Sequence, residues 1–218
     1  MPQPKAQLIP TAATRITMIM ILLGIITAYL LGSIPISYLM GKFFGVDVRK
    51  HGSGNVGATN VLRVLGKLPA AITLILDIAK GILAVTIVAS LFYRKGVIGF
   101  DLFGALLGLA VIAGHNWTIF LHFKGGKGVA TFIGVFAILL PIELIAGLLI
   151  WLLTVWITKY VSLGSILLAM SVPLIAAFSG KGIEIVALAI TACIIICYKH
   201  KSNINRLLIG TEHKIGEK

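Results

Sequence analysis

Residues 18–44 read MIMILLGIITAYLLGSIPISYLMGKFF, and this stretch decides the fold. Lys42 is its only charged residue. A helix needs about 20 mostly apolar residues to cross the hydrocarbon core of a bilayer. The stretch is long enough, so the sequence predicts a membrane-spanning helix here.

The rest of the chain has a similar composition. Of its 218 residues, 58% are hydrophobic and 12% are charged, whereas a soluble domain usually contains about 25% charged residues. A transmembrane β-barrel would show alternating segments of about ten residues, and none are evident. The composition therefore predicts an all-α, polytopic integral membrane bundle with no separate soluble domain.

Five more apolar runs follow the first one, at residues 69–93, 98–123, 128–160, 161–178 and 183–198. The run at 128–160 is too long for one crossing, and Pro141 divides it into a short and a longer helix. We therefore expect seven transmembrane helices. Five or six crossings stay open because the fourth and seventh helices are short. Residues 1–17 are expected to be a polar leader, and residues 18–218 a single transmembrane domain.

The formal net charge is +12. In a soluble protein this would suggest nucleic acid as a partner, but here the positive-inside rule is the first interpretation. With the N-terminus outside, thirteen Lys and Arg residues fall on predicted inner segments, five fall outside, and Lys80 lies within a helix. The distribution predicts an outer N-terminus and a cytoplasmic C-terminus. The basic loops would also attract anionic substrates or lipid headgroups.

Three polar segments lie on the predicted inner side, at residues 50–63, 114–128 and 200–212. The expected outer loops contain only short turns. This asymmetry predicts that the active surface faces the cytoplasm.

The first segment combines glycines with neutral donors and a cation. Gly52, Gly54 and Gly57 allow turns whose successive N–H groups form an anion-binding nest. Arg63 follows Thr59 by four residues, so both share one face of a helix. The neutral donors are Ser53, Asn55, Thr59 and Asn60. The alternative is a flexible polar linker between two helices.

The second segment contains the run Lys124-Gly125-Gly126-Lys127-Gly128 directly before an apolar helix. Free N–H groups at a helix N-terminus attract phosphate, and glycines allow a close approach. The spacing is not that of a P-loop, so we do not expect nucleotide hydrolysis. The alternative is that the lysines only mark an inner loop. His115, near the end of the preceding helix, is either functional or a structural hydrogen-bonding residue.

The third segment places His200, Asn203 and Arg206 at intervals of three. If the last helix continues, all three project on one side, where they suit a phosphate ester. The alternative is a basic helix that lies on lipid headgroups. Glu212 is expected to hold this segment to the basic loops and not to contact substrate.

Four further residues lie inside the predicted helices. Ionisable groups at membrane depth usually face the bundle and pair. Asp77 and Lys80, three apart, are therefore expected to pair with each other or with a loop, in a structural role. Cys193 and Cys197 are interpreted as small apolar side chains, since no further cysteine supports a metal or disulfide framework.

Together the three segments resemble the bacterial acyl-phosphate:glycerol-3-phosphate acyltransferase family. The similarity lies in Gly52-Ser53-Gly54-Asn55-x-Gly57-Ala58-Thr59-Asn60-x-x-Arg63, then Gly114-His115 with Phe123-Lys124-Gly125-Gly126-Lys127-Gly128-Val129-Ala130-Thr131, then His200-x-x-Asn203-x-x-Arg206-Leu207 with Gly210 and Glu212. It covers residues 24–212. One departure is Asn116-Trp117-Thr118, where the family tends to have a proline.

The resemblance implies a seven-helix enzyme of the bacterial inner membrane, with its active site at the cytoplasmic face. It would transfer a fatty acyl group from acyl phosphate to the sn-1 hydroxyl of glycerol 3-phosphate. The products are lysophosphatidic acid, for phospholipid biosynthesis, and phosphate. No cofactor, metal ion, nucleic acid or covalent acyl-enzyme is expected. Besides membrane lipids, the implied functional partner is the enzyme that produces acyl phosphate.

By motif position, the catalytic roles would fall on Ser53, Arg63, Lys127, His200 and Asn203. Substrate and phosphate binding would involve Gly52, Gly54, Asn55, Thr59, Asn60, His115, Lys124, Gly125, Gly126, Gly128 and Arg206. Apart from Glu212, for which a structural role is expected, the motifs contain no carboxylate, so we favour an oxygen of the acyl phosphate as the base, with His200 as the alternative. Ser53 as a nucleophile is a further possibility.

Three other classes of protein are compatible with parts of the pattern. A channel or transporter would need polar residues along a route through the membrane, and these lie mainly on one side. An acyl-CoA acyltransferase would show His-x4-Asp, and an alcohol phosphotransferase Asp-Gly-x2-Ala-Arg, and both runs are absent. A lipid-binding scaffold without catalysis is the third.

Overall fold

The computed structural model describes residues 11–216, and every regular element in that range is helical. The α-helices are α1 (Ala12–Ser33), α2 (Ile36–Phe43), α3 (Ala58–Leu65), α4 (Lys67–Leu83), α5 (Ala89–Phe92), α6 (Phe100–Asn116), α7 (Val129–Leu139), α8 (Pro141–Thr158), α9 (Val161–Phe178), α10 (Ile183–Lys199) and α11 (Lys201–Leu208). Two 3₁₀ turns, η1 (Val48–Lys50) and η3 (Ile119–Leu121), and a π-helical turn, η2 (Ala84–Val88), complete the set. The prediction of an all-α membrane bundle is confirmed.

Five helical segments are long and apolar enough to cross a membrane: Ala12–Phe43, Lys67–Phe92, Phe100–Leu121, Pro141–Thr158 and Val161–Phe178. A sixth is obtained if α10 and α11, which meet at a bend of 60°, count as one span. The eleven residues of α7 extend for only about 16 Å, roughly half of the hydrocarbon thickness. The count of seven and the orientation of the termini stay predictions.

Two helix breaks differ from the sequence-based expectation. The first apolar run is interrupted between Ser33 and Ile36, because Pro35 has no N–H group and disfavours helical backbone in the residue before it. The last helix also does not continue straight into α11, since the chain turns by 60° around His200. The condition of a continuous last helix is therefore not met, although His200, Asn203 and Arg206 still line one pocket.

The start of α1 falls inside the predicted leader. Residues 12–17 form its first turns, and the Thr11 hydroxyl caps the helix by accepting a hydrogen bond from the Thr14 N–H at 3.2 Å. The expectation for the rest of the leader, residues 1–10, lies outside the described residues.

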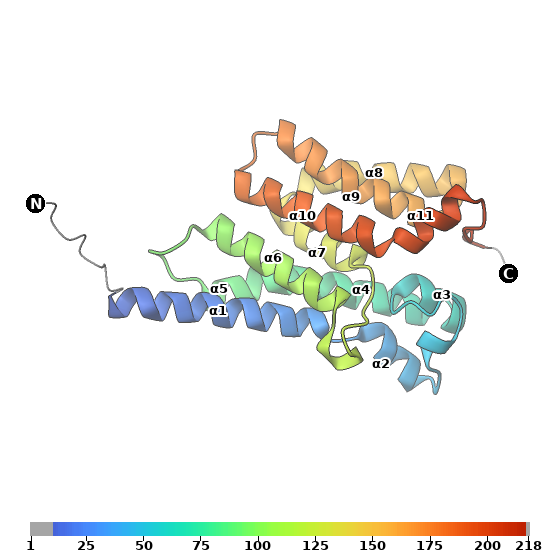
Figure 1. Ribbon diagram of the computed structural model, residues 1–218, viewed down its shortest axis with the longest axis horizontal. Coiled ribbons are helices and arrows are strands. Elements are labelled where there is room, and N and C mark those ends of the chain that lie inside the picture. The colour runs from blue at the N-terminus through green and yellow to red at the C-terminus, as the bar shows by residue number, and fades with distance from the viewer. Residues whose placement is uncertain (1–10, 217–218) are drawn as a thin grey trace, which may run out of the picture.

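The long helices run roughly side by side along the longest axis of the molecule (Figure 1). The start of α1 is at the left end, whereas α2, α3 and α11 gather at the right end. The main core packs α1 against α6, α4 against α7, and α9 against both α8 and α10. Many large hydrophobic side chains stay exposed, as expected for helices that face lipid. The right end of Figure 1 is thus where the short helices and polar loops meet.

Two of these helix pairs are in backbone contact. A Cβ atom at Gly81 on α4 would overlap the carbonyl oxygen of Thr131 on α7, and one at Gly134 would overlap that of Ile78. Between α1 and α6, a Cβ at Gly32 would overlap the carbonyl oxygen of Val111. Such close approach through small residues is typical of helix packing in membranes.

We expect Gly81→Ala to destabilise the protein by roughly 1–3 kcal/mol, because its methyl group must push α4 away from α7. The matched control is Gly104→Ala on α6, where the nearest atom to an added Cβ is Leu139 Cδ2 at 3.7 Å. The measurement is the thermal midpoint of the purified protein in detergent. Equal midpoints for the two variants would contradict the close α4–α7 packing.

Candidate active site

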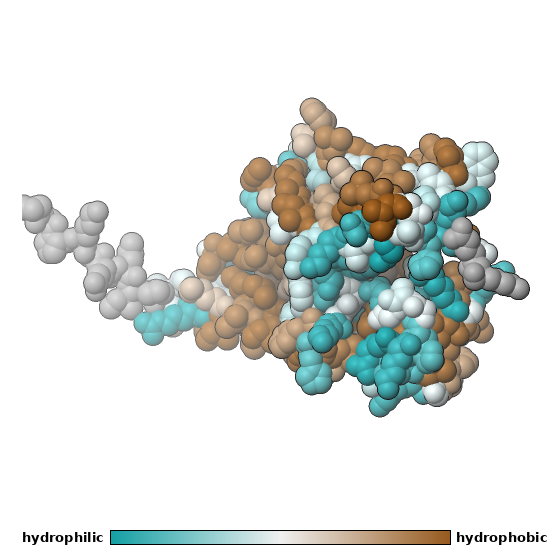
Figure 2. All heavy atoms as spheres, turned by 45° about the vertical axis from the view of Figure 1, so that its right-hand side comes forward, coloured by the Kyte–Doolittle hydropathy of each residue, from teal (hydrophilic) through white to brown (hydrophobic). Residues whose placement is uncertain are grey.

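One large pocket opens at the polar end of the bundle, with a volume of about 990 Å³. The space-filling view shows hydrophilic side chains around a hollow at this end, with hydrophobic surface on either side (Figure 2). All three polar segments of the sequence contribute to the lining, together with α4, α7, α8 and the start of α9. The expectation that these segments share one site is therefore met in the geometry.

Most of the residues proposed from the sequence line this pocket: Ser53, Gly54, Asn55, Thr59, Asn60, Arg63, Asp77, His115, Gly125, Lys127, Gly128, His200, Asn203, Arg206 and Glu212. Three residues that were predicted to bind substrate do not line the pocket, and the structure corrects the prediction for them: Gly52, Lys124 and Gly126. Gly52 and Lys124 are exposed, and Gly126 is buried against His115.

The first loop is organised by Asn60, which is 1% exposed. Its Oδ1 accepts hydrogen bonds from the N–H of Ser53 at 2.8 Å and from the Ser53 hydroxyl at 3.2 Å. Its Nδ2 donates to the carbonyls of Val48 at 2.8 Å and His51 at 3.2 Å. Asn60 thus holds Ser53 at the pocket and has no donor left for a ligand, which corrects its predicted role in substrate binding.

The helix α3 carries the cation of the first segment. Gly57 caps its N-terminus, and Thr59 and Arg63 lie on the pocket side one turn apart, as their spacing predicted. Lys67, just beyond Gly66, also lines the pocket. Neither Arg63 nor Lys67 has a carboxylate partner among residues 11–216, so both charges are available to an anion.

The second loop reaches the N-terminus of α7. The N–H groups of Gly125 and Gly126 donate to the carbonyls of Asn116 at 3.2 Å and His115 at 3.1 Å. They are therefore used inside the protein and do not face a ligand. The N–H groups in the first turn of α7, in contrast, have no earlier carbonyl as a partner.

Gly128 caps α7 in the left-handed conformation, with φ at 84°. A Cβ there would lie 2.7 Å from Asn116 Oδ1, so glycine is required by both backbone and space. The result is a helix N-terminus that opens directly into the pocket, the arrangement that binds phosphate in many proteins.

Lys127 connects the second and third segments. Its ammonium donates to Oδ1 of Asn203, whose Nδ2 donates to Oε1 of Glu212 at 2.6 Å. Burial is the main cause that lowers the pKa of Lys127 to about 8. The guanidinium groups of Arg206 and Arg63 act in the same direction, and the Glu212 carboxylate opposes them. A bound anion would relieve this repulsion.

Glu212 fixes the C-terminal segment. Its carboxylate accepts hydrogen bonds from Ser162 on α9 at 2.7 Å, from Asn203, and from Arg206 Nε at 2.7 Å. Burial raises the pKa of Glu212, but these hydrogen bonds outweigh it, and the pKa lies below its usual value. Glu212 therefore fastens α11 to α9, whereas we had expected it to hold the basic loops.

His200 lies at the bend between α10 and α11 and is 3% exposed. Its Nδ1 lies 2.8 Å from the carbonyl of Ile196. A carbonyl can only accept a hydrogen bond, so Nδ1 carries the hydrogen in this contact. His200 therefore lines the pocket with a fixed ring.

Sequence reasoning did not single out several lining residues, among them Lys67, Trp151, Ser162, Ser165 and Lys199. Lys199 donates to the carbonyl of Asn116 at 2.9 Å and thereby ties α10 to α6. In the sequence analysis, Lys67 and Lys199 contributed only to the count of charges on the inner side. Ser162 and Ser165, three apart at the start of an apolar helix, were a usable signal.

The described residues contain no group of three or more His, Cys, Asp and Glu side chains placed to hold a metal ion. Cations instead dominate the polar lining. The fold and the pocket together thus define a helical membrane protein with a cation-lined pocket at one end of its bundle.

Known proteins are similar to this chain over most of its length. A glycerol-3-phosphate acyltransferase of Desulforamulus reducens is 46% identical over 204 residues, which cover 93% of this chain and 98% of that protein. One of Halalkalibacterium halodurans is also 46% identical, over 89% of this chain and 95% of its own.

Two solved structures are similar to the whole bundle. The crystal structure of PlsY (YgiH), an integral membrane glycerol 3-phosphate acyltransferase, in its glycerol 3-phosphate form is 40% identical with a TM-score of 0.83. It covers 90% of this chain and 96% of that one. The lysophosphatidic acid form gives a TM-score of 0.81, with 90% and 95% covered.

The protein is an integral membrane acyltransferase. More closely, the chain belongs to the glycerol-3-phosphate acyltransferase family, whose model matches residues 22–210.

We expect the affinity of the pocket for sulfate to fall about tenfold per pH unit above pH 8, because Lys127 loses its proton there while the charge of sulfate is constant. In Lys127→Arg, which stays cationic, affinity should be weaker and its fall with pH clearly smaller, with only Lys199, whose pKa burial also lowers, left to contribute. The measurement is isothermal titration between about pH 7 and 10. The same slope in Lys127→Arg would show that another group is responsible.

Proposed function

We propose that this chain transfers a fatty acyl group from acyl phosphate to the sn-1 hydroxyl of glycerol 3-phosphate, at the cytoplasmic face of the bacterial inner membrane. The products are lysophosphatidic acid and phosphate, and the reaction serves phospholipid biosynthesis. An enzyme that produces acyl phosphate must supply the donor.

The observation that carries this proposal is the mixed lining of the pocket. It contains the cations Arg63, Lys67, Lys127 and Lys199. It also contains apolar side chains from three helices: Leu74 and Ile78 on α4, Ile133 on α7, and Leu148 and Trp151 on α8. A substrate with a phosphate head and an acyl tail matches such a lining, and a fully water-soluble donor does not need it.

The cations also account for the presence of two anions in one site. Acyl phosphate and glycerol 3-phosphate repel each other in water, and several uncompensated positive charges in a partly buried pocket offset this repulsion. The helix N-terminus at Gly128 adds N–H groups for one of the phosphates. Holding the hydroxyl against the acyl carbon lowers the barrier by up to roughly 7–11 kcal/mol.

The chemical step needs no covalent intermediate. The sn-1 hydroxyl oxygen forms a bond to the acyl carbon, the bond from that carbon to the phosphate oxygen breaks, and phosphate leaves with the electron pair. We infer that the hydroxyl proton passes to an oxygen of the acyl phosphate. Ser53, Arg63, Lys127, His200 and Asn203 then act by binding and orienting, and Ser53 is not acylated.

The test of the proposed function uses purified protein with radiolabelled glycerol 3-phosphate and one of two donors. We expect lysophosphatidic acid from acyl phosphate and none from acyl-CoA, with the acyl group at sn-1 by NMR. Lys127→Met should abolish turnover, whereas Lys95→Met, a lysine outside the pocket, should retain it. Turnover with acyl-CoA, or uptake of label into vesicles without product, would contradict the proposal.

The choice of base gives a separate prediction for His200→Ala. If the donor phosphate takes the proton, kcat should fall by only about tenfold, less than the 10²–10⁴-fold typical of a removed general base. The control is His51→Ala, an exposed histidine outside the pocket. A loss of turnover beyond about 100-fold with unchanged substrate binding would assign the base to His200 instead.

A further inference from the structure

We propose that Asp77, Lys80 and His115 form a positioning cluster that fixes the loop of residues 123–128, which leads to the N-terminus of α7. His115 acts through this loop without contacting the substrate. The inference rests on the proposed function and deepens it. It replaces the interpretation of His115 as a substrate ligand.

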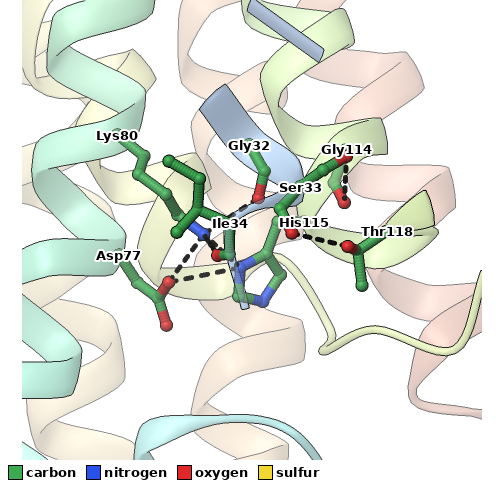
Figure 3. A network of polar contacts seen from close by, with 8 residues as sticks. All are labelled: Gly32, Ser33, Ile34, Asp77, Lys80, Gly114, His115 and Thr118. Atoms are coloured by element: carbon green, nitrogen blue, oxygen red, sulfur yellow. Dashed lines mark hydrogen bonds and ion pairs between the residues drawn. The ribbon is translucent and has the colours of Figure 1, made fainter. Parts of the chain in front are cut away.

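The cluster is centred on the ammonium of Lys80, which is 4% exposed (Figure 3). It donates to the carbonyls of Gly32 and Ile34, each at 2.9 Å, and pairs with Asp77 Oδ1 at 2.8 Å. The ammonium thus lies between two carbonyl oxygens and one carboxylate oxygen. The ion pair that the sequence predicted is thus present, and it also joins α4 to the end of α1.

His115 faces this pair with one ring nitrogen. Its Nδ1 lies 3.5 Å from Asp77 Oδ1 and 3.4 Å from Lys80 Nζ. Nδ1 therefore hydrogen-bonds with the ammonium of Lys80 and lies beside the carboxylate of Asp77. This contact fixes the rotation of the ring.

The other side of His115 supports the loop. Its carbonyl accepts the Gly126 N–H at 3.1 Å, and a Cβ at Gly126 would overlap its Nε2. The ring therefore lies directly against the Gly126 backbone, two residues before the cap of α7. A displacement of the ring would therefore move the loop, and the loop would in turn move the N–H groups at the N-terminus of α7.

The C-terminal end of α1 is hydrogen-bonded to the residues on either side of His115. Ser33 Oγ donates to the carbonyl of Gly114 at 3.4 Å, and Thr118 Oγ1 donates to the carbonyl of Ser33 (Figure 3). Gly32, Asp77, His115 and Gly126 also surround one small cavity of about 10 Å³. Three helices and the loop therefore meet at His115.

The decisive experiment compares His115→Asn with His115→Gln. The Asn amide can occupy the position of Nδ1 and keep the contact with the Asp77–Lys80 pair, whereas the Gln amide reaches the position of Nε2 and loses it. We expect His115→Gln to raise KM for glycerol 3-phosphate and weaken sulfate binding about tenfold, with kcat within about twofold. His115→Asn should stay within about twofold of wild type in all three.

Two further measurements separate positioning from a general loss of structure. Hydrogen–deuterium exchange of a peptide covering residues 123–128 should increase in His115→Gln and not in His115→Asn. Asp77→Asn and His115→Gln should combine less than additively in the double variant, because both disturb the same cluster. His122→Asn, an exposed histidine in the same loop, is the control.

The opposite ranking of the two His115 variants, additive effects in the double variant, or unchanged exchange would each overturn the inference. Failure of the proposed function is distinguishable from these outcomes. It would appear as wild-type protein without turnover, while loop exchange and sulfate affinity still report on the positioning cluster.

Discussion

Every polar backbone group at membrane depth needs a partner within the protein, and this constraint governs the architecture of the site. Pro35 ends α1 inside the bundle and leaves carbonyls without helical partners. Lys80 supplies two of the missing hydrogen bonds, and its own charge then requires Asp77. A helix break, a buried cation and a buried carboxylate thus depend on one another.

The second organising feature is an imbalance of charge at the pocket. Arg63, Lys67, Lys127 and Lys199 face it, and Glu212 is already occupied by Arg206, Asn203 and Ser162. The cations of the pocket therefore repel one another at the place where we propose that an anion binds. This also explains why the carboxylate nearest to Lys127 acts through Asn203 and not directly, since a direct ion pair would cancel the charge that a ligand needs.

Hydropathy was sufficient to predict the helical bundle, and the bounds predicted for α9 agree with those observed, because apolar length and Pro or Gly punctuation are local properties. The grouping of the three polar segments also followed, since they share one side of the membrane in the predicted topology. The uses of individual donors did not follow. Asn60, Gly125 and Gly126 all carry suitable groups, yet these groups bond to carbonyls of the protein itself, which only the tertiary structure reveals.

The combination of cationic and apolar residues in the pocket lining has a consequence for inhibitors. A compound that combines an anionic head with a long apolar tail would dissolve in the bilayer before it reaches the site, so its effective concentration would depend on the amount of lipid present. Potencies measured in detergent and in liposomes would then differ for the same compound. Rankings between compounds would reflect partitioning as well as fit, unless tail length is held constant.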